Sequence, residues 1–299
     1  MSSDRQPCNP HLESSKYCLH PVLKRGKRCG LYKASILKDL KGHCWRIEAG
    51  KHNRVEGGNV ADVVLILGSG PNAVSAKDWP RSVFDAVVSI NNAWRIRKDW
   101  THLIHPEDFP EDRQPNDLQP TQKRVQHTEY VPQNNAFGGV LFAGGTMAFT
   151  AGYWALGALK PKVMAFIGCD MVYPKSGQTH FYGNGVADPL RADVSLQSLE
   201  GKAARLGLIA AQSDCRVVNL SVEESRLVFP RATIDTIEAA APRAPCPVEE
   251  VYALRRAENA LGYDAPSGRY WEIVDRIESS KLAAIDAQWL ALWEQTYSP

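Results

Sequence analysis

One stretch of the chain decides the fold, and it reads Val63-Val64-Leu65-Ile66-Leu67-Gly68-Ser69-Gly70-Pro71-Asn72-Ala73. Five consecutive apolar residues rich in β-branched side chains are typical of a strand that is buried on both faces, as in a parallel sheet. The glycines that follow fit the dinucleotide-binding pattern G-x-G-x-x-G/A, whose backbone can approach a phosphate near a helix N-terminus. The plainer alternative is a tight structural turn. The pattern predicts nucleotide contact by Gly68, Ser69, Gly70, Pro71 and Asn72.

The rest of the central chain alternates strands with helices, which is typical of an α/β protein. Further buried strands are predicted at Phe84–Ile90, His102–Ile104, Val163–Ile167 and Val217–Leu220. Helices are predicted at Ala73–Trp79, at Gly145–Gly157 and from Leu190 to Ala210. We expect a Rossmann-like, mostly parallel sheet with helices on both faces. Residues 1–60 then form an N-terminal extension, 61–238 the nucleotide-binding catalytic domain, and 239–299 a linker (Ala239–Pro247) with two C-terminal helices, the last carrying Ile273 to Trp293.

The charge of the chain is unevenly distributed. The 299 residues carry 35 Lys and Arg against 33 Asp and Glu, a formal net charge of +2. Residues 1–57 hold 12 of the basic and 5 of the acidic residues, which leaves 23 against 28 for the remainder. The sequence therefore predicts an acidic globular body and a basic extension with at most short helical pieces, such as Gly30–Leu40. Because the body has no basic excess, we expect no nucleic-acid partner.

Features of the N-terminus and the cysteines point to a cytoplasmic protein. The N-terminus has no apolar stretch of the kind found in secretory signals, and no run of 18 apolar residues occurs anywhere. Seven cysteines without a signal peptide indicate reduced thiols. The spacing of Cys8, Cys18, Cys29 and their neighbouring histidines fits no zinc-finger pattern, so no metal site is predicted. The basic run Lys24–Arg28 could touch an anionic membrane surface, although a solvated tail is the plainer interpretation.

Polar residues stand at the ends of two further predicted strands. A nicotinamide-dependent enzyme would usually place an acidic residue at the end of its second strand, but this chain has Asn91 and Asn92 there. An Asn amide both donates and accepts, which suits a base edge or a sugar, while an Asx turn is the alternative. Asp170 ends the strand at Val163–Ile167 and could orient a ligand or cap its loop. We count Asn91, Asn92 and Asp170 as nucleotide-binding candidates.

Two loops carry the candidate chemistry. His180 lies in the loop Met171–Asp188, beyond the carboxyl end of a predicted strand, where a neutral imidazole can act as a general base. Tyr173 and Tyr182 in the same loop could donate hydrogen bonds to a departing phosphate. The alternative is a loop histidine packed on aromatic rings. The polar segment Pro106–Ala136 is predicted to be a long loop that covers the site.

Together these residues resemble the bacterial sialyltransferases that cap lipo-oligosaccharides. The similarity lies in the turn Leu67–Asn72, the strand Phe84-Asp85 to Asn91, the small-residue helix Gly145–Gly157, and Thr179-His180-Phe181-Tyr182-Gly183, which is similar to the family's Ser-His-Tyr-x-Gly. It covers roughly residues 62–222. The family has Asn where Ser69 stands, and a basic residue before the position of Gly144 that this chain lacks.

The resemblance implies a fold, a reaction and roles for residues. The family is Rossmann-like, metal-independent and uses CMP-sialic acid. By the resemblance, His180 is the general base, Tyr173 binds phosphate and Asn91 contacts the nucleotide, while Tyr182 is a candidate from its place in the loop alone. Gly145 and Thr146, at the start of the small-residue helix, join the nucleotide-binding candidates. We expect no cofactor beyond a CMP-sugar donor, and a glycan or small-molecule acceptor.

Two other functions stay open at this point. One is another transferase on the same scaffold, such as a pterin diphosphokinase-like enzyme that needs ATP and magnesium. The other is a non-catalytic module that binds a nucleotide or a partner. No D-x-D triplet occurs in the chain, so the sequence predicts no metal on a diphosphate. The sequence leaves the oligomeric state open, including a homo-oligomer.

Overall fold

The computed structural model describes residues 36–38, 44–46, 62–174, 176–184, 192–237 and 245–297, the first two ranges by their backbone only. The chain divides into two units, Met1–Gly57 and Gly58–Pro299. In the first unit the strands β1 (Ile36–Lys38) and β2 (Cys44–Arg46) pair antiparallel. The helical piece expected at Gly30–Leu40 is therefore wrong at residues 36–38, which form a strand instead. The run Lys24–Arg28 and Cys8, Cys18 and Cys29 lie outside the described residues.

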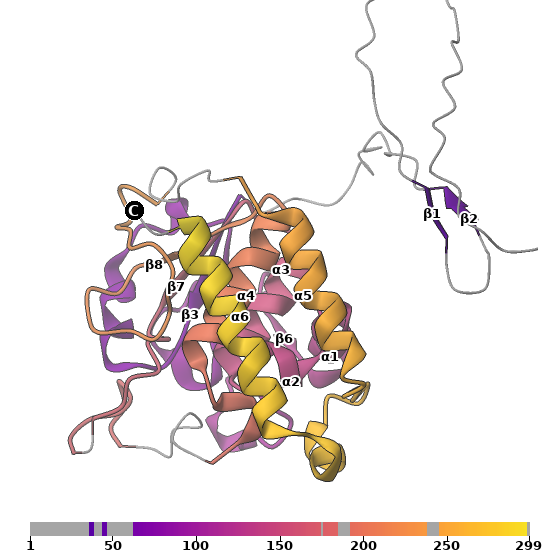
Figure 1. Ribbon diagram of the computed structural model, residues 1–299. Coiled ribbons are helices and arrows are strands. Elements are labelled where there is room, and N and C mark those ends of the chain that lie inside the picture. The colour runs from indigo at the N-terminus through magenta and orange to yellow at the C-terminus, as the bar shows by residue number, and fades with distance from the viewer. Residues whose placement is uncertain are drawn as a thin grey trace, which may run out of the picture. The chain divides into compact units, whose positions relative to one another are not determined.

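The second unit is built on a parallel sheet, which confirms the predicted α/β fold (Figure 1). Its six strands, counted over the described residues, are β3 (Val63–Leu67), β4 (Ala86–Ile90), β5 (His102–Ile104), β6 (Lys123–Val125), β7 (Val163–Ile167) and β8 (Arg216–Asn219). They lie in the order β6-β5-β4-β3-β7-β8. At the end of β3, Leu67 lies beside Ser89 of β4 and Ile167 of β7.

The order of the strands creates a switch point at β3. The chain first adds β4, β5 and β6 on one side of β3, and then returns to place β7 and β8 on its other side. The helical segments that follow β3 and β7 therefore lie on opposite faces of the sheet. In open α/β sheets the crevice that opens at such a reversal is the usual place for a ligand.

The two faces of the sheet are covered differently. The face with Val64 and Ile66 packs against the α-helical layer, which consists of α1 (His127–Ala136), α3 (Met147–Ala158), α4 (Leu199–Gln212), α5 (Val248–Ala260) and α6 (Ser279–Tyr297). In Figure 1, α6 runs beside α4 in this layer. The face with Leu65 and Leu67 packs against 3-10 segments, η1 (Pro71–Asp78) and η3 (Asn91–Arg95), and the buried Ile237.

Shorter elements connect these layers. They are η2 (Arg81–Val83), η4 (Glu111–Arg113), α2 (Val140–Ala143), η6 (Val194–Leu196) and η7 (Tyr270–Arg276). Residues of α2, α6 and the segment that includes η7 form a separate apolar cluster around Phe142 and Leu282. Among the helices of the described residues, none has the length and apolar character needed to cross a membrane.

Three predicted helices begin or wind differently in the structure. The helix expected at Ala73–Trp79 is the 3-10 segment η1, which starts at Pro71. The helix expected from Leu190 begins at Leu199, because the Ser198 side chain caps it by accepting a hydrogen bond from the Gly201 N–H. Leu190 itself lies outside the described residues, as do residues 239–244 of the expected linker. The last helix begins at Ser279, and Ile273 belongs to η7.

The long loop expected at Pro106–Ala136 is wrong in its second half. Residues 123–125 form the edge strand β6, in which only Val125 is buried. The chain then enters α1, where the Gln126 N–H donates to Glu129 Oε2 (3.1 Å) in a capping box. The sequence carries no strand signal here, because two of the three residues are charged, as is common at a sheet edge that faces solvent. Only the segment 106–122, with η4 inside it, remains irregular.

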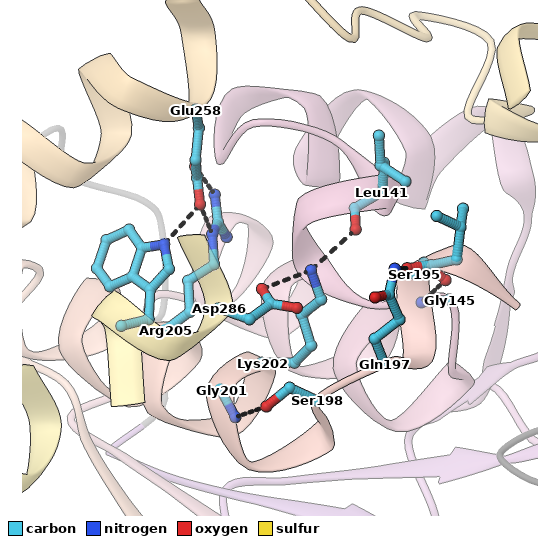
Figure 2. Close-up of polar contacts among 12 residues, drawn as sticks. Leu141, Gly145, Ser195, Gln197, Ser198, Gly201, Lys202, Arg205, Glu258 and Asp286 are labelled. Atoms are coloured by element: carbon cyan, nitrogen blue, oxygen red, sulfur yellow. Dashed lines mark hydrogen bonds and ion pairs between the residues drawn. The ribbon is translucent and has the colours of Figure 1, made fainter. Parts of the chain in front are cut away.

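Buried charges hold the C-terminal helices against α4 (Figure 2). Arg205 of α4 is 0% exposed and donates from Nε to Glu258 Oε1 of α5 (2.7 Å) and from Nη2 to Oε2 (2.8 Å). Trp289 of α6 donates to the same carboxylate (2.7 Å). One turn earlier on α4, Lys202 forms an ion pair of 2.9 Å with Asp286 of α6. These contacts fix α5 and α6, and with them the η7 segment that connects the two helices.

Candidate functional site

A cavity of about 230 Å³ opens at the carboxyl ends of β3, β4 and β7, where the strand order reverses. We call it the first cavity. Its walls come from the turn after β3, the end of β4, the segment 106–113, the start of α3 and the loop after β7. Of the residues predicted from the sequence, it brings together Gly68, Ser69, Gly70, Asn91, Asn92, Thr146, Tyr173, His180 and Tyr182.

The glycine turn packs tightly against the turn that follows β7. The Gly68 N–H donates to Ile167 O (2.8 Å), and the Gly70 N–H donates to Gly168 O (2.8 Å). A Cβ atom on Gly68 would collide with Gly168 O and Cys169 Sγ, and one on Gly70 would lie 3.0 Å from Gly168 O. Close packing of the two turns therefore accounts for both glycines. Since these two N–H groups are already bonded, the turn contributes the shape of the wall.

The two asparagines at the end of β4 present unpaired amide oxygens. Asn91 adopts a left-handed conformation (φ 52°), which turns the chain sharply from β4 into η3. Asn92 is only 3% exposed. The Oδ1 atoms of both side chains are buried and accept no hydrogen bond from any of the described residues. Because a buried polar atom without a partner is costly, this wall is prepared for a ligand that donates hydrogen bonds.

His180 is held in place by backbone bonds and aromatic rings. Its N–H donates to Gly183 O (2.9 Å), and the next residue, Phe181, donates to Ser69 O (3.0 Å), which ties the loop to the glycine turn. The imidazole stacks on Tyr182 with ring centres 5.0 Å apart, and its centre lies 6.2 Å from that of Tyr173. His180 Nδ1 lies 2.9 Å from Thr179 Oγ1. When Nδ1–H donates to that hydroxyl, Nε2 carries the lone pair that a general base needs.

Thr146 lies on a wall shared with a larger neighbouring cavity. It caps α3, its Oγ1 accepting from the Phe149 N–H (3.3 Å). The neighbour, which we call the second cavity, measures about 840 Å³ and shares Pro106, Thr146 and Met147 with the first. Gly145 lines only the second cavity.

A hydrogen-bond network anchors the start of α3 to η7. The Gly145 N–H donates to Ser195 Oγ (3.0 Å), a contact visible in Figure 2. Ser195 Oγ donates to Asp193 Oδ1 (2.6 Å), and the Tyr270 hydroxyl donates to Asp193 Oδ2 (2.6 Å). Because Ser195 is fully buried, this network fixes the wall of the second cavity from behind.

Besides Gly145, three predicted site residues lie away from the lining of the first cavity. Asn72 Nδ2 donates to Asp170 Oδ2 (2.7 Å) and to Ser221 Oγ (2.8 Å), and Asn219 Nδ2 lies 3.4 Å from Asp170 Oδ1. Asn72 and Asp170 thus join the ends of β3, β7 and β8. Pro71 begins η1 and is absent from both cavity linings.

The first cavity also contains residues that the sequence did not single out. Arg113 of η4 reaches its wall, together with Phe109, from the irregular segment 106–122. Among the described residues, no hydrogen bond or ion pair engages the Arg113 guanidinium, and its backbone O accepts from Trp94 Nε1 (3.0 Å). Met147 and Met171 add apolar surface. No local sequence pattern distinguishes Arg113 from other arginines in polar loops. Its position at the cavity follows only from the way in which the segment 106–122 packs against the sheet.

The cysteine in this cavity is not a nucleophile. Cys169 follows β7 and is 5% exposed. Burial raises the pKa of its thiol far above the ordinary value, and the neighbouring Asp170 charge adds to that increase. A protonated, buried thiol is unreactive. The polar groups that line the cavity with reactive or hydrogen-bonding potential therefore include the imidazole, the phenols, the amides and the Arg113 guanidinium.

Within the ranges that the structure describes, no three His, Cys, Asp or Glu side chains come together as metal ligands would. In comparisons with known proteins, no family model, no curated protein and no solved structure matches the chain.

Proposed function

We propose that the protein is a glycosyltransferase that moves a sugar from a CMP-activated donor to an acceptor hydroxyl, with inversion and without a metal. The observation that carries the proposal is the first cavity itself. It places an imidazole flanked by phenols, His180 with Tyr173 and Tyr182, in the same small space as the unpaired amides of Asn91 and Asn92. An acid–base group and a base-reading wall are what such a transfer requires.

The amide wall would read the nucleotide. A cytosine presents an amino group and its ribose presents hydroxyls, all of which can donate to an Asn oxygen. Asn92 Oδ1 is buried and lacks a donor, so binding such a group would relieve an existing cost. The 3% exposure of Asn92 means that water competes little for that position.

Arg113 would supply the positive charge that faces the phosphate. CMP donors carry a single phosphate at the sugar linkage, so one guanidinium and two phenol donors neutralise much of the charge on the leaving group. Arg113 reaches the wall from η4, and Tyr173 and Tyr182 reach it from the loop after β7. The guanidinium stands in for the basic residue that the resembling family has before the position of Gly144.

The reaction would proceed as a single displacement. The acceptor oxygen forms a bond to the anomeric carbon while the bond from that carbon to the phosphate oxygen breaks, and CMP leaves with the electron pair. The acceptor proton passes to His180 Nε2, whose partner nitrogen Nδ1 lies 2.9 Å from Thr179 Oγ1. That contact would orient the ring and stabilise the imidazolium that forms. The phenols of Tyr173 and Tyr182 would donate to the departing phosphate.

The two cavities together offer room for both substrates. About 230 Å³ is below the usual size of a ligand pocket, whereas the adjoining second cavity has about 840 Å³. We place the nucleotide in the first cavity, with the sugar toward the shared wall of Pro106, Thr146 and Met147. The acceptor would then approach through the second cavity.

His180→Ala tests the mechanism. We expect loss of at least about a hundredfold in the turnover of a CMP-sugar, with transfer to water as the readout while the acceptor is unidentified. CMP affinity should stay within about twofold, because the amide wall is untouched. Tyr252→Ala is the control, since Tyr252 is exposed on α5 and lines neither cavity, and it should leave transfer to water unchanged. Full turnover in the His180 variant would remove His180 from the mechanism, and a requirement for ATP with magnesium would favour the diphosphokinase-like alternative.

A further inference from the structure

We propose that the second cavity binds a hydroxylated small molecule that carries a protonated amino group. The cavity measures about 840 Å³ and is walled by Glu107 and Asp108 after β5, by α1 and α3, and by the segment 267–272 that includes the start of η7. The assignment of this molecule as the acceptor rests on the proposed function.

Two nearly buried side chains bring hydroxyl groups to the lining of the cavity. Tyr130 is 8% exposed and Thr150 is 4% exposed, and both line the cavity. Within the described part of the chain, no hydrogen bond uses either side-chain hydroxyl. Neither hydroxyl oxygen is fully enclosed, so both stay accessible, and a polar ligand in the cavity would find two hydrogen-bonding groups on this wall. Hydroxyls on the ligand would satisfy both.

The charge of the cavity selects a cation. Three carboxylates line it, and Arg269 lies 3.3 Å from Glu107 and 3.9 Å from Glu272, which leaves Asp108 without an ion pair among the described residues. His127, 3.9 Å from Glu107, is the other basic group on this wall. Burial raises the pKa of Tyr130, and the charges of Glu107 and Asp108 raise it further, which is a second sign of negative potential. An anionic ligand would be repelled here.

Aromatic rings complete the wall on the side of η7. Trp271 is 60% exposed, although it is one of the largest apolar side chains on the surface, and its ring meets Tyr270 edge-on with centres 5.6 Å apart. Tyr270 is fixed through its bond to Asp193. An ammonium group is attracted to the face of an indole, and nearby carboxylates strengthen the preference for a cation.

The two cavities thus differ in charge across one shared wall. Arg113 lines the first cavity and suits an anionic nucleotide, whereas Asp108, Glu107 and Glu272 line the second and suit a cation. This division would also keep two different substrates from exchanging places. A neutral sugar would use the hydroxyls of Tyr130 and Thr150 alone, and would gain nothing from the carboxylates.

A matched pair of probes tests the proposal, namely glucosamine, which carries an ammonium group, and N-acetylglucosamine, which does not. Binding to the full chain is followed by NMR titration. We expect glucosamine to bind at least about fivefold more tightly, and its affinity to fall with added salt. Asp108→Asn and Glu272→Gln should each weaken it by roughly two- to fivefold, as an exposed ion pair does. Asp275→Asn is the control, because Asp275 lies on η7 outside the cavity lining.

Each outcome of this experiment decides the proposal. Equal affinity for the two probes, no binding of glucosamine, or equal effects of the Glu272 and Asp275 variants would overturn it. CMP is titrated separately. Binding of glucosamine without binding of CMP would support the second cavity and reject the proposed function, whereas binding of CMP without glucosamine would do the reverse.

Discussion

Breaking the buried ion pair between Arg205 and Glu258 should destabilise the protein far more than breaking an exposed pair of the same geometry. Glu258 accepts from Arg205 at 2.7 and 2.8 Å and from Trp289 at 2.7 Å, and both charged side chains are at most 1% exposed. Glu258→Gln would leave a guanidinium in the interior without a counter-charge. Loss of one partner of a buried pair costs about 3–5 kcal/mol in the free energy of unfolding.

The chain contains a matched control for that substitution. Arg226 donates to Glu200 through Nε (2.7 Å) and Nη2 (2.9 Å), so the two pairs have the same two-pronged geometry. The Arg226 and Glu200 side chains, however, are 37% and 36% exposed. Water therefore solvates whichever charge is left, and Glu200→Gln should cost no more than about 1 kcal/mol.

Urea unfolding followed by circular dichroism measures both variants against the parent protein. Glu258→Gln should lower the urea midpoint several times more than Glu200→Gln does. Added salt should reduce the loss of unfolding free energy in the Glu200 variant only, because salt screens the exposed pair. If the two variants lose the same free energy of unfolding, burial does not increase the contribution of the Arg205–Glu258 pair to stability. The attachment of α5 would then depend mainly on apolar contacts, and that of α6 on apolar contacts and the Lys202–Asp286 ion pair.

Two further predictions concern the sheet and the glycine turn. Burial lowers the pKa of His102 to about 4 from 6.5. The unfolded state therefore binds the proton more readily, and the free energy of unfolding falls as the pH drops below 6.5. Between pH 7 and pH 5 this loss of unfolding free energy is about 2 kcal/mol. Urea unfolding at the two pH values should show the loss in the parent protein and not in His102→Asn. Equal losses in the two proteins would contradict the prediction. Gly68→Ala should lower the free energy of unfolding by about 3 kcal/mol, because its Cβ would collide with the Gly168 backbone and the Cys169 sulfur. Gly70→Ala, whose Cβ has more room, should lower it by about 1 kcal/mol. Thermal unfolding compares the two, and a harmless Gly68→Ala would contradict the packing of the turns.

Local sequence predicted the central strands because each is a short run of apolar residues that needs no context. Val63–Leu67 and Val163–Ile167 are such runs, and both strands lie at those residues. The edge strand at Lys123–Val125 could not be predicted in this way, because only one of its residues is buried and pairing with β5 determines it. The 3-10 winding of η1 likewise depends on packing against the sheet.

The site residues that follow the ends of predicted strands could be predicted from the sequence. Asn91, Asn92 and His180 follow predicted strands, and parallel strands bring their carboxyl ends to one edge. Arg113 and Trp271 were not predictable, because an arginine in a polar loop and a tryptophan in a C-terminal segment reach the cavities only through long-range packing. The roles of Asn72 and Asp170 needed coordinates too, since only distances show that they bond to each other.

Binding of a cytidine monophosphate group in the first cavity can be measured by comparing the thermal shifts that CMP, CDP, UDP, NAD and ATP produce. At about 100 times its Kd, CMP should raise the melting temperature of a domain this large by roughly 5–10 °C. Asn92→Leu, which removes the buried amide from the wall, should abolish most of that shift. Stabilisation by NAD or ATP with none by CMP, or a CMP shift that Asn92→Leu leaves intact, would contradict the account.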